Sequence, residues 1–186
     1  GVGNSCAVRT PTGNRPPVVN GGPDYTIPVQ TPFELTAGGS DPDGDPLSFS
    51  WEEGDLGPAA MLNAPDDGQI PLFRSIAPTA DPRRTIPRLT NLLNNVSDLS
   101  ERLPVVGRTM DFRVTARDNT AGGGAYAQDD VVITVSSSSG PFLVTAPNTS
   151  LSFSAGSTTT VTWNVAGTNL PPVSAANVDV LLSVDG

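Results

Sequence analysis

Three aspartates stand two residues apart in SDPDGDPLSFSWEE, the stretch at residues 40–53. Carboxylates crowded into one turn repel each other unless a cation lies between them, and Ca²⁺ takes about six to eight oxygen ligands of this kind. Asp41, Asp43 and Asp45 are therefore candidate calcium ligands. The alternative is a solvated turn without an ion, because Asp, Pro and Gly all favour turns.

The EF-hand pattern does not describe this stretch, although its first three ligand positions are filled. The position that requires glycine for a sharp turn is Pro46, and proline cannot supply that geometry. The following LSFSWE alternates apolar and polar residues as a strand does, so no helix leaves the loop. We expect a turn between two strands and a further aspartate from elsewhere in the chain. Asp118, at the end of the pattern TMDFRVTARD, is the best candidate.

Composition excludes several classes of function for this chain. There is no histidine, which rules out a His-containing catalytic triad, an H-E-x-x-H zinc protease and a His-ligated catalytic zinc. Lysine is also absent and the net charge is −9, which argues against a nucleic-acid or anionic-membrane partner. No segment approaches the roughly 18 apolar residues of a membrane span.

The ends of the chain suggest a piece of a longer, secreted protein. The first residue is Gly1 rather than an initiator methionine, and no signal peptide is visible. The single cysteine, Cys6, cannot form an internal disulfide. It is either a reduced thiol or half of a bridge to sequence outside this chain, and its place near the N-terminus favours the bridge.

Alternating apolar and polar residues predict an all-β fold. The alternation is clear in PFELTA, LSFSWE, TMDFRVTARD and DDVVITV. A period of two with one polar face is typical of antiparallel strands packed on one side, so we expect an immunoglobulin-like β-sandwich at residues 18–136. Residues 1–17 are rich in Pro, Gly and polar residues and are expected to form a linker.

The strand pattern breaks at about residues 54–107, too long for an ordinary loop. Within this insertion, IPRLTNLLNN predicts a short helix, with apolar residues at helical spacing at Ile86, Leu89, Leu92 and Leu93. The nearby basic cluster of Arg83, Arg84 and Arg88 is expected to form a solvated face, or else to pair with acids across an interface.

A second strand series follows the serine-rich stretch at 137–140, which we interpret as a hinge. It comprises PFLVTAP, SLSFSAG, TTTVTWNVAG and NVDVLLSVDG. Residues 141–186 are about half of the roughly 100 residues that a complete sandwich needs. This partial sandwich is expected to borrow cover from the first domain, or from self-association with another copy.

These segments, read in order, resemble a known module. GNRPPVVNGGPDYTIPVQTPFELTA, SDPDGDPLSFSWEE and RTMDFRVTARDNTAGGG are similar to the polycystic-kidney-disease-type or cadherin-like sandwich. More closely, they resemble the region that follows the catalytic domain in secreted bacterial reprolysin-like zinc metalloproteases, and PLFRSIAPTADPRRTIP within the insertion adds to the likeness. GPFLVTAPNTS, TTTVTWNVAGTN and NVDVLLSVDG resemble the module that comes next in those proteins.

The resemblance implies where a calcium ion is bound. In such modules the ion lies where the lead-in, the D-x-D-G turn and the aspartate after a late strand converge. Carried over to this chain, the ligands are Asp41, Asp43 and Asp118, with Asn14 or its neighbouring backbone; Asp45 is a less secure member. The family's catalytic zinc motif is missing, so the chain is expected to be a non-catalytic partner of a catalytic domain.

Three functions therefore compete. The first is an extracellular accessory module that calcium stabilises. The second is a module that binds a protein or polysaccharide, for which Tyr25 and Tyr126 are candidate surface residues; Trp51 and Trp163 alternate with apolar neighbours and are expected in the core. The third is a carboxylate-based hydrolase, for which Glu52, Glu53 and Asp55 are candidates, although solvated surface acids explain them equally well.

Overall fold

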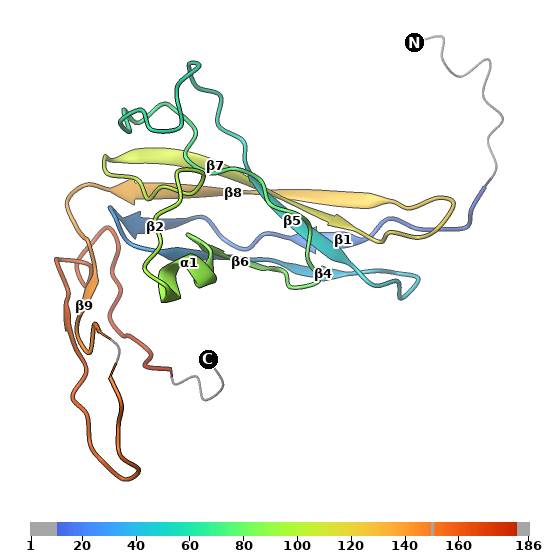
Figure 1. Ribbon diagram of the computed structural model, residues 1–186. Coiled ribbons are helices and arrows are strands. Elements are labelled where there is room, and N and C mark those ends of the chain that lie inside the picture. The colour runs from blue at the N-terminus through green and yellow to red at the C-terminus, as the bar shows by residue number, and fades with distance from the viewer. Residues whose placement is uncertain (1–10, 150, 182–186) are drawn as a thin grey trace.

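The computed structural model describes residues 11–149 and 151–181, which fold mostly as β-strands (Figure 1). The strands are β1 (Val18–Asn20), β2 (Tyr25–Pro28), β3 (Phe33–Thr36), β4 (Gly38–Ser40), β5 (Ser48–Glu53), β6 (Arg83–Ile86), β7 (Arg108–Arg117), β8 (Tyr126–Ser136), β9 (Leu143–Ala146) and β10 (Thr162–Asn164). The one helix in the described part of the chain is α1 (Leu89–Leu93). The prediction of an all-β protein is confirmed.

A four-stranded sheet in the order β2-β8-β7-β5 forms the largest layer. The long hairpin β7–β8 lies at its centre, with Arg108 opposite Val135 and Arg117 opposite Tyr126. β5 pairs antiparallel with β7, whereas β2 pairs parallel with β8. β1–β4 and β3–β6 form two further short antiparallel pairs, and β4 and β6 lie below β7 and β8 in the view of Figure 1.

The core joins the four-stranded sheet to the β3–β6 pair. Phe112 from β7 packs against Phe33 from β3 with ring centroids 6.0 Å apart, and against Phe73 at 5.7 Å. On β7, alternate residues point inward, so Met110, Phe112 and Val114 are at most 1% exposed. The strands predicted from alternation in PFELTA, LSFSWE, TMDFRVTARD and DDVVITV are all present. Trp51 is buried, as predicted, and its indole N–H donates to the Pro82 carbonyl at 2.9 Å.

The insertion is less helical and more integrated than the sequence suggests. Ile86 is not a helical residue: it ends β6, which pairs with β3, and it is fully buried. The expected helix shrinks to α1, whose five residues include none that is buried. The insertion instead supplies core side chains through an irregular segment that contains Ile70, Leu72 and Phe73.

A buried ion pair fastens the insertion to the sheets, and it corrects the prediction of a solvated arginine face. Arg84, on β6, is 4% exposed and its guanidinium lies 2.8 Å from Glu101, whose side chain is fully enclosed. Arg84 also donates to the carbonyls of Trp51 and Arg74 at 2.7 Å each. The backbone N–H of Arg88 donates to the other Glu101 oxygen. Of the predicted cluster, Arg83 pairs with the exposed Asp81, and the Nε of the partly exposed Arg88 lies 3.4 Å from Glu101.

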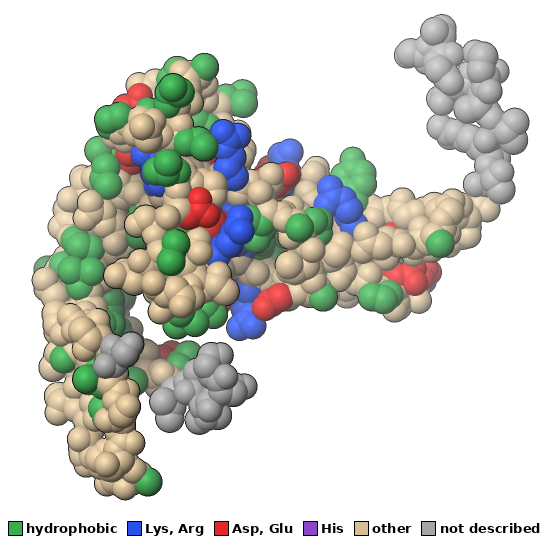
Figure 2. Space-filling view, viewed as in Figure 1, with side chains coloured by type: hydrophobic (Ala, Val, Ile, Leu, Met, Phe, Trp, Pro, Cys, Tyr) green, Lys and Arg blue, Asp and Glu red, His purple; other side chains and the backbone are tan. Residues whose placement is uncertain are grey.

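The C-terminal region, residues 141–181, has little interior of its own. β9 and β10 form a two-stranded sheet, and Thr168 is the one buried residue in the described part of this region. Trp163 is 38% exposed, so its predicted place in a core is wrong. No strand forms in the described residues of SLSFSAG or NVDVLLSVDG, and part of the latter, like Cys6, lies outside the described residues. Figure 2 shows hydrophobic side chains on this region's surface.

No helix among the described residues is long and apolar enough to cross a membrane.

Candidate calcium site and acidic cleft

Three segments that are distant in sequence meet at one end of the four-stranded sheet (Figure 1). They are the lead-in at residues 11–17, the β4–β5 turn and the loop that joins β7 to β8. Asn14 Nδ2 donates to Asp118 Oδ2 at 2.7 Å and to the Gly123 carbonyl at 3.0 Å. The structure thus brings together the segments that the sequence nominated for calcium binding.

Asp118 is the anchor of this end. It follows β7 directly, is 2% exposed, and its Oδ1 accepts the backbone N–H groups of Thr120 at 3.1 Å and Ala125 at 2.8 Å. The hydrogen bond from Asn14, followed by those from the backbone, lowers the pKa of the Asp118 carboxyl below its ordinary value. Asp118 is therefore held as a carboxylate and is well placed to balance positive charge.

Asp41 and Asp43 face different partners within the turn. Asp41 Oδ1 accepts the backbone N–H of Asp43 at 2.8 Å and that of Asp45 at 3.3 Å, which closes the turn. Asp43 instead accepts the Arg15 backbone N–H at 2.7 Å and the Arg15 Nε at 2.8 Å. These two hydrogen bonds from Arg15 lower the pKa of Asp43. Arg15 thus places a positive charge beside Asp43, whose only predicted positively charged partner was a calcium ion.

Asp45 points toward the β7–β8 loop, where its Oδ2 accepts the Thr120 hydroxyl at 2.7 Å. Together with the Asn14 bonds, this contact ties the turn, the lead-in and the loop into one unit.

Two buried oxygens at this end have no hydrogen-bond donor: Asn14 Oδ1 and Asp41 Oδ2. Buried oxygens without a donor are costly, and a hard cation is one group that satisfies them. A pre-formed metal site is not present, however: the described residues contain no cluster of three or more acidic or Cys side chains spaced to hold a metal. At this end of the sheet, Asn14 Oδ1 and Asp41 Oδ2 are thus left without a partner, while Asp43 is bonded to Arg15 and Asp118 to Asn14 and the backbone.

The two tyrosines nominated for surface binding do not form a common platform. Tyr25 is half-buried against the core and its hydroxyl donates to the Glu34 carbonyl at 2.8 Å. Burial, with a smaller effect from Glu34, raises the pKa of Tyr25 to about 12. Tyr126 is 63% exposed. Tyr25 pairs with Ile133 on β8, seven residues from Tyr126, which at about 3.3 Å per residue separates the two backbone positions by roughly 20 Å along the strand.

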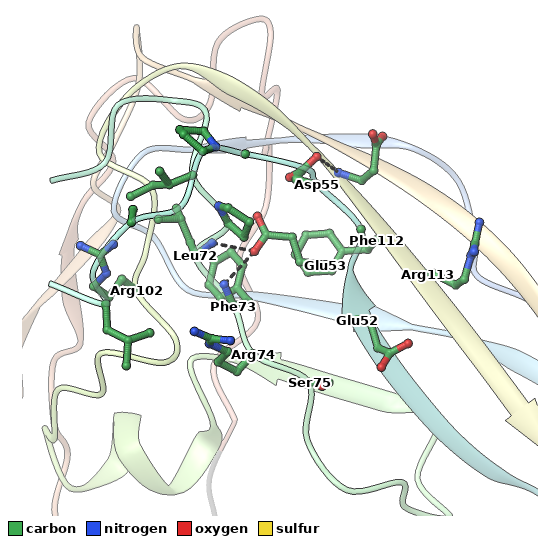
Figure 3. A pocket seen from close by; sticks show the side chains of 18 of the residues that line it. Glu52, Glu53, Asp55, Leu72, Phe73, Arg74, Ser75, Arg102, Phe112 and Arg113 are labelled. Atoms are coloured by element: carbon green, nitrogen blue, oxygen red, sulfur yellow. Dashed lines mark hydrogen bonds between the residues drawn. The ribbon is translucent and has the colours of Figure 1, made fainter. Parts of the chain in front are cut away.

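A cleft of about 1040 Å³ lies beside the end of β5, and it contains the other acidic cluster (Figure 3). Glu53 has no exposed side-chain area, and its Oε2 accepts the backbone N–H groups of Leu72 and Phe73 at 2.7 Å each. Burial is the main cause that raises the pKa of Glu53 to about 7, and the adjacent Asp55 carboxyl adds to it. Glu52 alternates to the exposed face.

This pair is not arranged as in a glycosidase, whose two carboxyl groups stand about 5–9.5 Å apart on either side of a substrate bond. Glu53 Oε1 and Asp55 Oδ2 instead face one guanidinium nitrogen, Arg108 Nη2, at 3.7 and 3.6 Å. Their shared neighbour is Arg108, 2% exposed at the side chain, which was not singled out from the sequence. A signal was present: Arg108 is in phase with Met110 and Phe112 on the core face of β7.

Comparison with known proteins adds no assignment: no family model, no curated protein and no solved structure matches the chain.

Proposed function

We propose that this chain is a non-catalytic, calcium-stabilised module of a secreted metalloprotease-like protein. It would serve as a rigid accessory to a catalytic domain in the same parent protein. The observation that carries the proposal is the convergence of the lead-in, the β4–β5 turn and Asp118 at one end of the sheet, where Asn14 Oδ1 and Asp41 Oδ2 have no donors. The sequence resemblance supplies the parent class, and the immunoglobulin-like arrangement is part of the same proposal.

The arrangement suits a structural ion better than a catalytic one. Asn14 and Arg15 lie in the lead-in, and each contacts an acid of the main body. A cation held by Asn14, Asp41 and Asp118 would cross-link the lead-in to two loops, so it would fix the direction in which the preceding chain enters. That role requires no exposed ligand position and no histidine.

The test is a thermal melt of the full chain in excess calcium and in chelator. A ligand at about 100 times its dissociation constant adds about 2.7 kcal/mol to the free energy of unfolding. At about 2–4 °C per kcal/mol for a chain of this size, we expect calcium to raise the melting temperature by roughly 5–10 °C. Equal melts in calcium and chelator, with no metal found by elemental analysis, would refute the calcium proposal.

Two matched variants locate the ion. Asp41→Asn keeps an Oδ1 that closes the turn but loses the charge of the donor-free oxygen, so it should abolish most of the calcium effect. Asp45→Asn changes a residue bonded to Thr120 and should retain the effect. If both variants respond to calcium as wild type does, the ion binds elsewhere.

A further inference from the structure

The buried acids beside the cleft carry more negative charge than their surroundings balance. Arg108 Nη2 lies 3.7 Å from Glu53 Oε1 and 3.6 Å from Asp55 Oδ2, and Arg108 Nη1 lies 3.1 Å from Asp66 Oδ1. The side chains of Glu53, Asp55 and Asp66 are 0%, 15% and 4% exposed. Three carboxylates around one guanidinium would leave excess charge in a region nearly closed to water, which is unfavourable.

The three acids differ in the number of hydrogen-bond donors that they have. Asp66 accepts two donors besides its ionic contact with Arg108 Nη1: the backbone N–H groups of Gly68 and Val105, at 2.9 Å each. Asp66 is therefore fully satisfied as a carboxylate. Glu53 Oε1 and Asp55 Oδ2, in contrast, are buried and accept no hydrogen bond. One proton between these two oxygens supplies the missing donor and reduces the excess charge.

We propose that Glu53 and Asp55 share a proton and act as a pH-sensitive latch that fastens the insertion to the four-stranded sheet. Glu53 ends β5 and holds the insertion through Leu72 and Phe73. Asp55 Oδ1 accepts the backbone N–H of Asp111 on β7 at 3.2 Å (Figure 3). When the proton leaves, two adjacent carboxylates repel each other, and the segment that covers the cleft loosens.

Other charged groups near the latch do not replace the proton. The cleft is also lined by Glu52, Asp111, Arg74, Arg102, Arg113 and Asp130, of which Arg113 and Asp130 pair with each other. Arg102 is engaged by the Ala64 carbonyl, and Arg108 already contacts all three acids. Asp67, which interacts with Arg108 through space, adds further negative charge. The latch does not depend on the proposed calcium site, whose ligands lie in other segments.

The sign of the pH effect follows from the position of the Glu53 pKa. Its value of about 7 in the folded protein exceeds the ordinary value of 4.5, so the folded state binds more protons between these limits. The latch therefore holds the insertion against the four-stranded sheet most strongly below about pH 4.5, and it weakens as pH rises to about 7. In this window the equilibrium constant for opening should rise by up to about tenfold per pH unit.

The experiment measures amide hydrogen exchange and urea midpoints of the full chain from pH 5 to 8, in calcium and in chelator. In wild type we expect the protection factors of the Leu72 and Phe73 amides to fall with rising pH, relative to the Val114 amide in β7. Glu53→Gln should remove this dependence, because its carbonyl still accepts both amides while its NH₂ donates to Asp55. Glu52→Gln, one residue away on the exposed face, should behave as wild type.

If Glu53→Gln does not fold, a direct titration of the Glu53 carboxyl tests the latch instead. The Glu53 carboxyl, followed by ¹³C chemical shift, should titrate far above 4.5 in wild type and closer to 4.5 in Asp55→Asn, where a permanent donor replaces the shared proton. A wild-type midpoint near 4.5, or equal pH profiles for wild type and Glu53→Gln, would overturn the latch.

Discussion

The main body, residues 11–140, and the C-terminal region, residues 141–181, show the same alternation in sequence but differ in what the alternation buries. In the main body every second residue of β7 is enclosed between two layers. In the C-terminal region, Leu143, Val144 and Trp163 on β9 and β10 are 49%, 50% and 38% exposed. Alternation is thus sufficient for a strand but not for a core, because a core also needs a second apolar layer.

Two hydrogen bonds join the described residues of the two regions. The Gly140 N–H donates to the Ala166 carbonyl, and the Phe142 N–H donates to the Thr31 hydroxyl. We therefore expect the stability of the main body to be largely its own.

The largest effect should come from a core substitution in the main body, compared with an aromatic substitution in the C-terminal region. Phe112 is 1% exposed, so Phe112→Ala should lower the free energy of unfolding by about 3–5 kcal/mol. Trp163→Ala removes a larger ring from an exposed strand and should change the same transition by less than about 0.5 kcal/mol. Urea denaturation followed by circular dichroism measures both. A loss of several kcal/mol in Trp163→Ala would show that the two regions unfold together through that ring.

The next effect concerns ion pairs rather than apolar packing. Glu101→Gln leaves the Arg84 guanidinium buried without its carboxylate, which should cost about 3–5 kcal/mol. Asp130→Asn breaks the exposed pair with Arg113 and should cost at most about 1 kcal/mol. Equal small losses in both variants would mean that the insertion is not held by its buried charge.

Most of the strands were predictable, whereas the buried charges were not. β3, β5, β7 and β8 alternate over most of their lengths, so most of their inward residues follow from the period. β6 was missed because Arg84 occupies its inward position, where the pattern has an arginine instead of an apolar residue. Its partner Glu101 is 17 residues away along the chain, and no local spacing indicates that pairing.

In the candidate sites, too, the ionic contacts were harder to predict from the sequence than the strands. The convergence of Asn14, Asp41 and Asp118 could be anticipated from the resemblance, but the Arg15–Asp43 contact could not, since arginine in a linker looks solvated. For the acidic cleft a signal existed: Glu53 is in phase with the buried Phe49 and Trp51 on β5. A charged residue in phase with a core face indicates a buried ionic site, and Arg84 and Arg108 follow the same pattern.

Removal of the C-terminal region tests the comparison directly. A chain that ends at Gly140 loses the Phe142 bond to Thr31 and the Gly140 bond to Ala166. At about 0.5–1.5 kcal/mol per net hydrogen bond, we expect a loss of about 1–3 kcal/mol with an unchanged cooperative transition. Differential scanning calorimetry of the two chains measures it. Failure of the shorter chain to fold would show that the C-terminal region completes the main body after all.

The smallest expected effect distinguishes a half-buried tyrosine from an exposed one. Tyr25→Phe removes the hydroxyl that donates to the Glu34 carbonyl, so it should cost about 1 kcal/mol at neutral pH, while Tyr126→Phe should cost less than about 0.5 kcal/mol. The pKa of Tyr25 is about 12 in the folded protein and 10 in its ordinary state, so the folded state retains the proton longer. Its contribution to stability is therefore lost as pH rises from about 10 to 12, and this alkaline loss should be weaker in Tyr25→Phe. Urea midpoints at pH 9 and pH 11 measure the difference. If wild type and Tyr25→Phe lose the same stability at alkaline pH, the loss comes from the titration of other groups. The Tyr25 hydroxyl would then contribute only through its hydrogen bond at neutral pH.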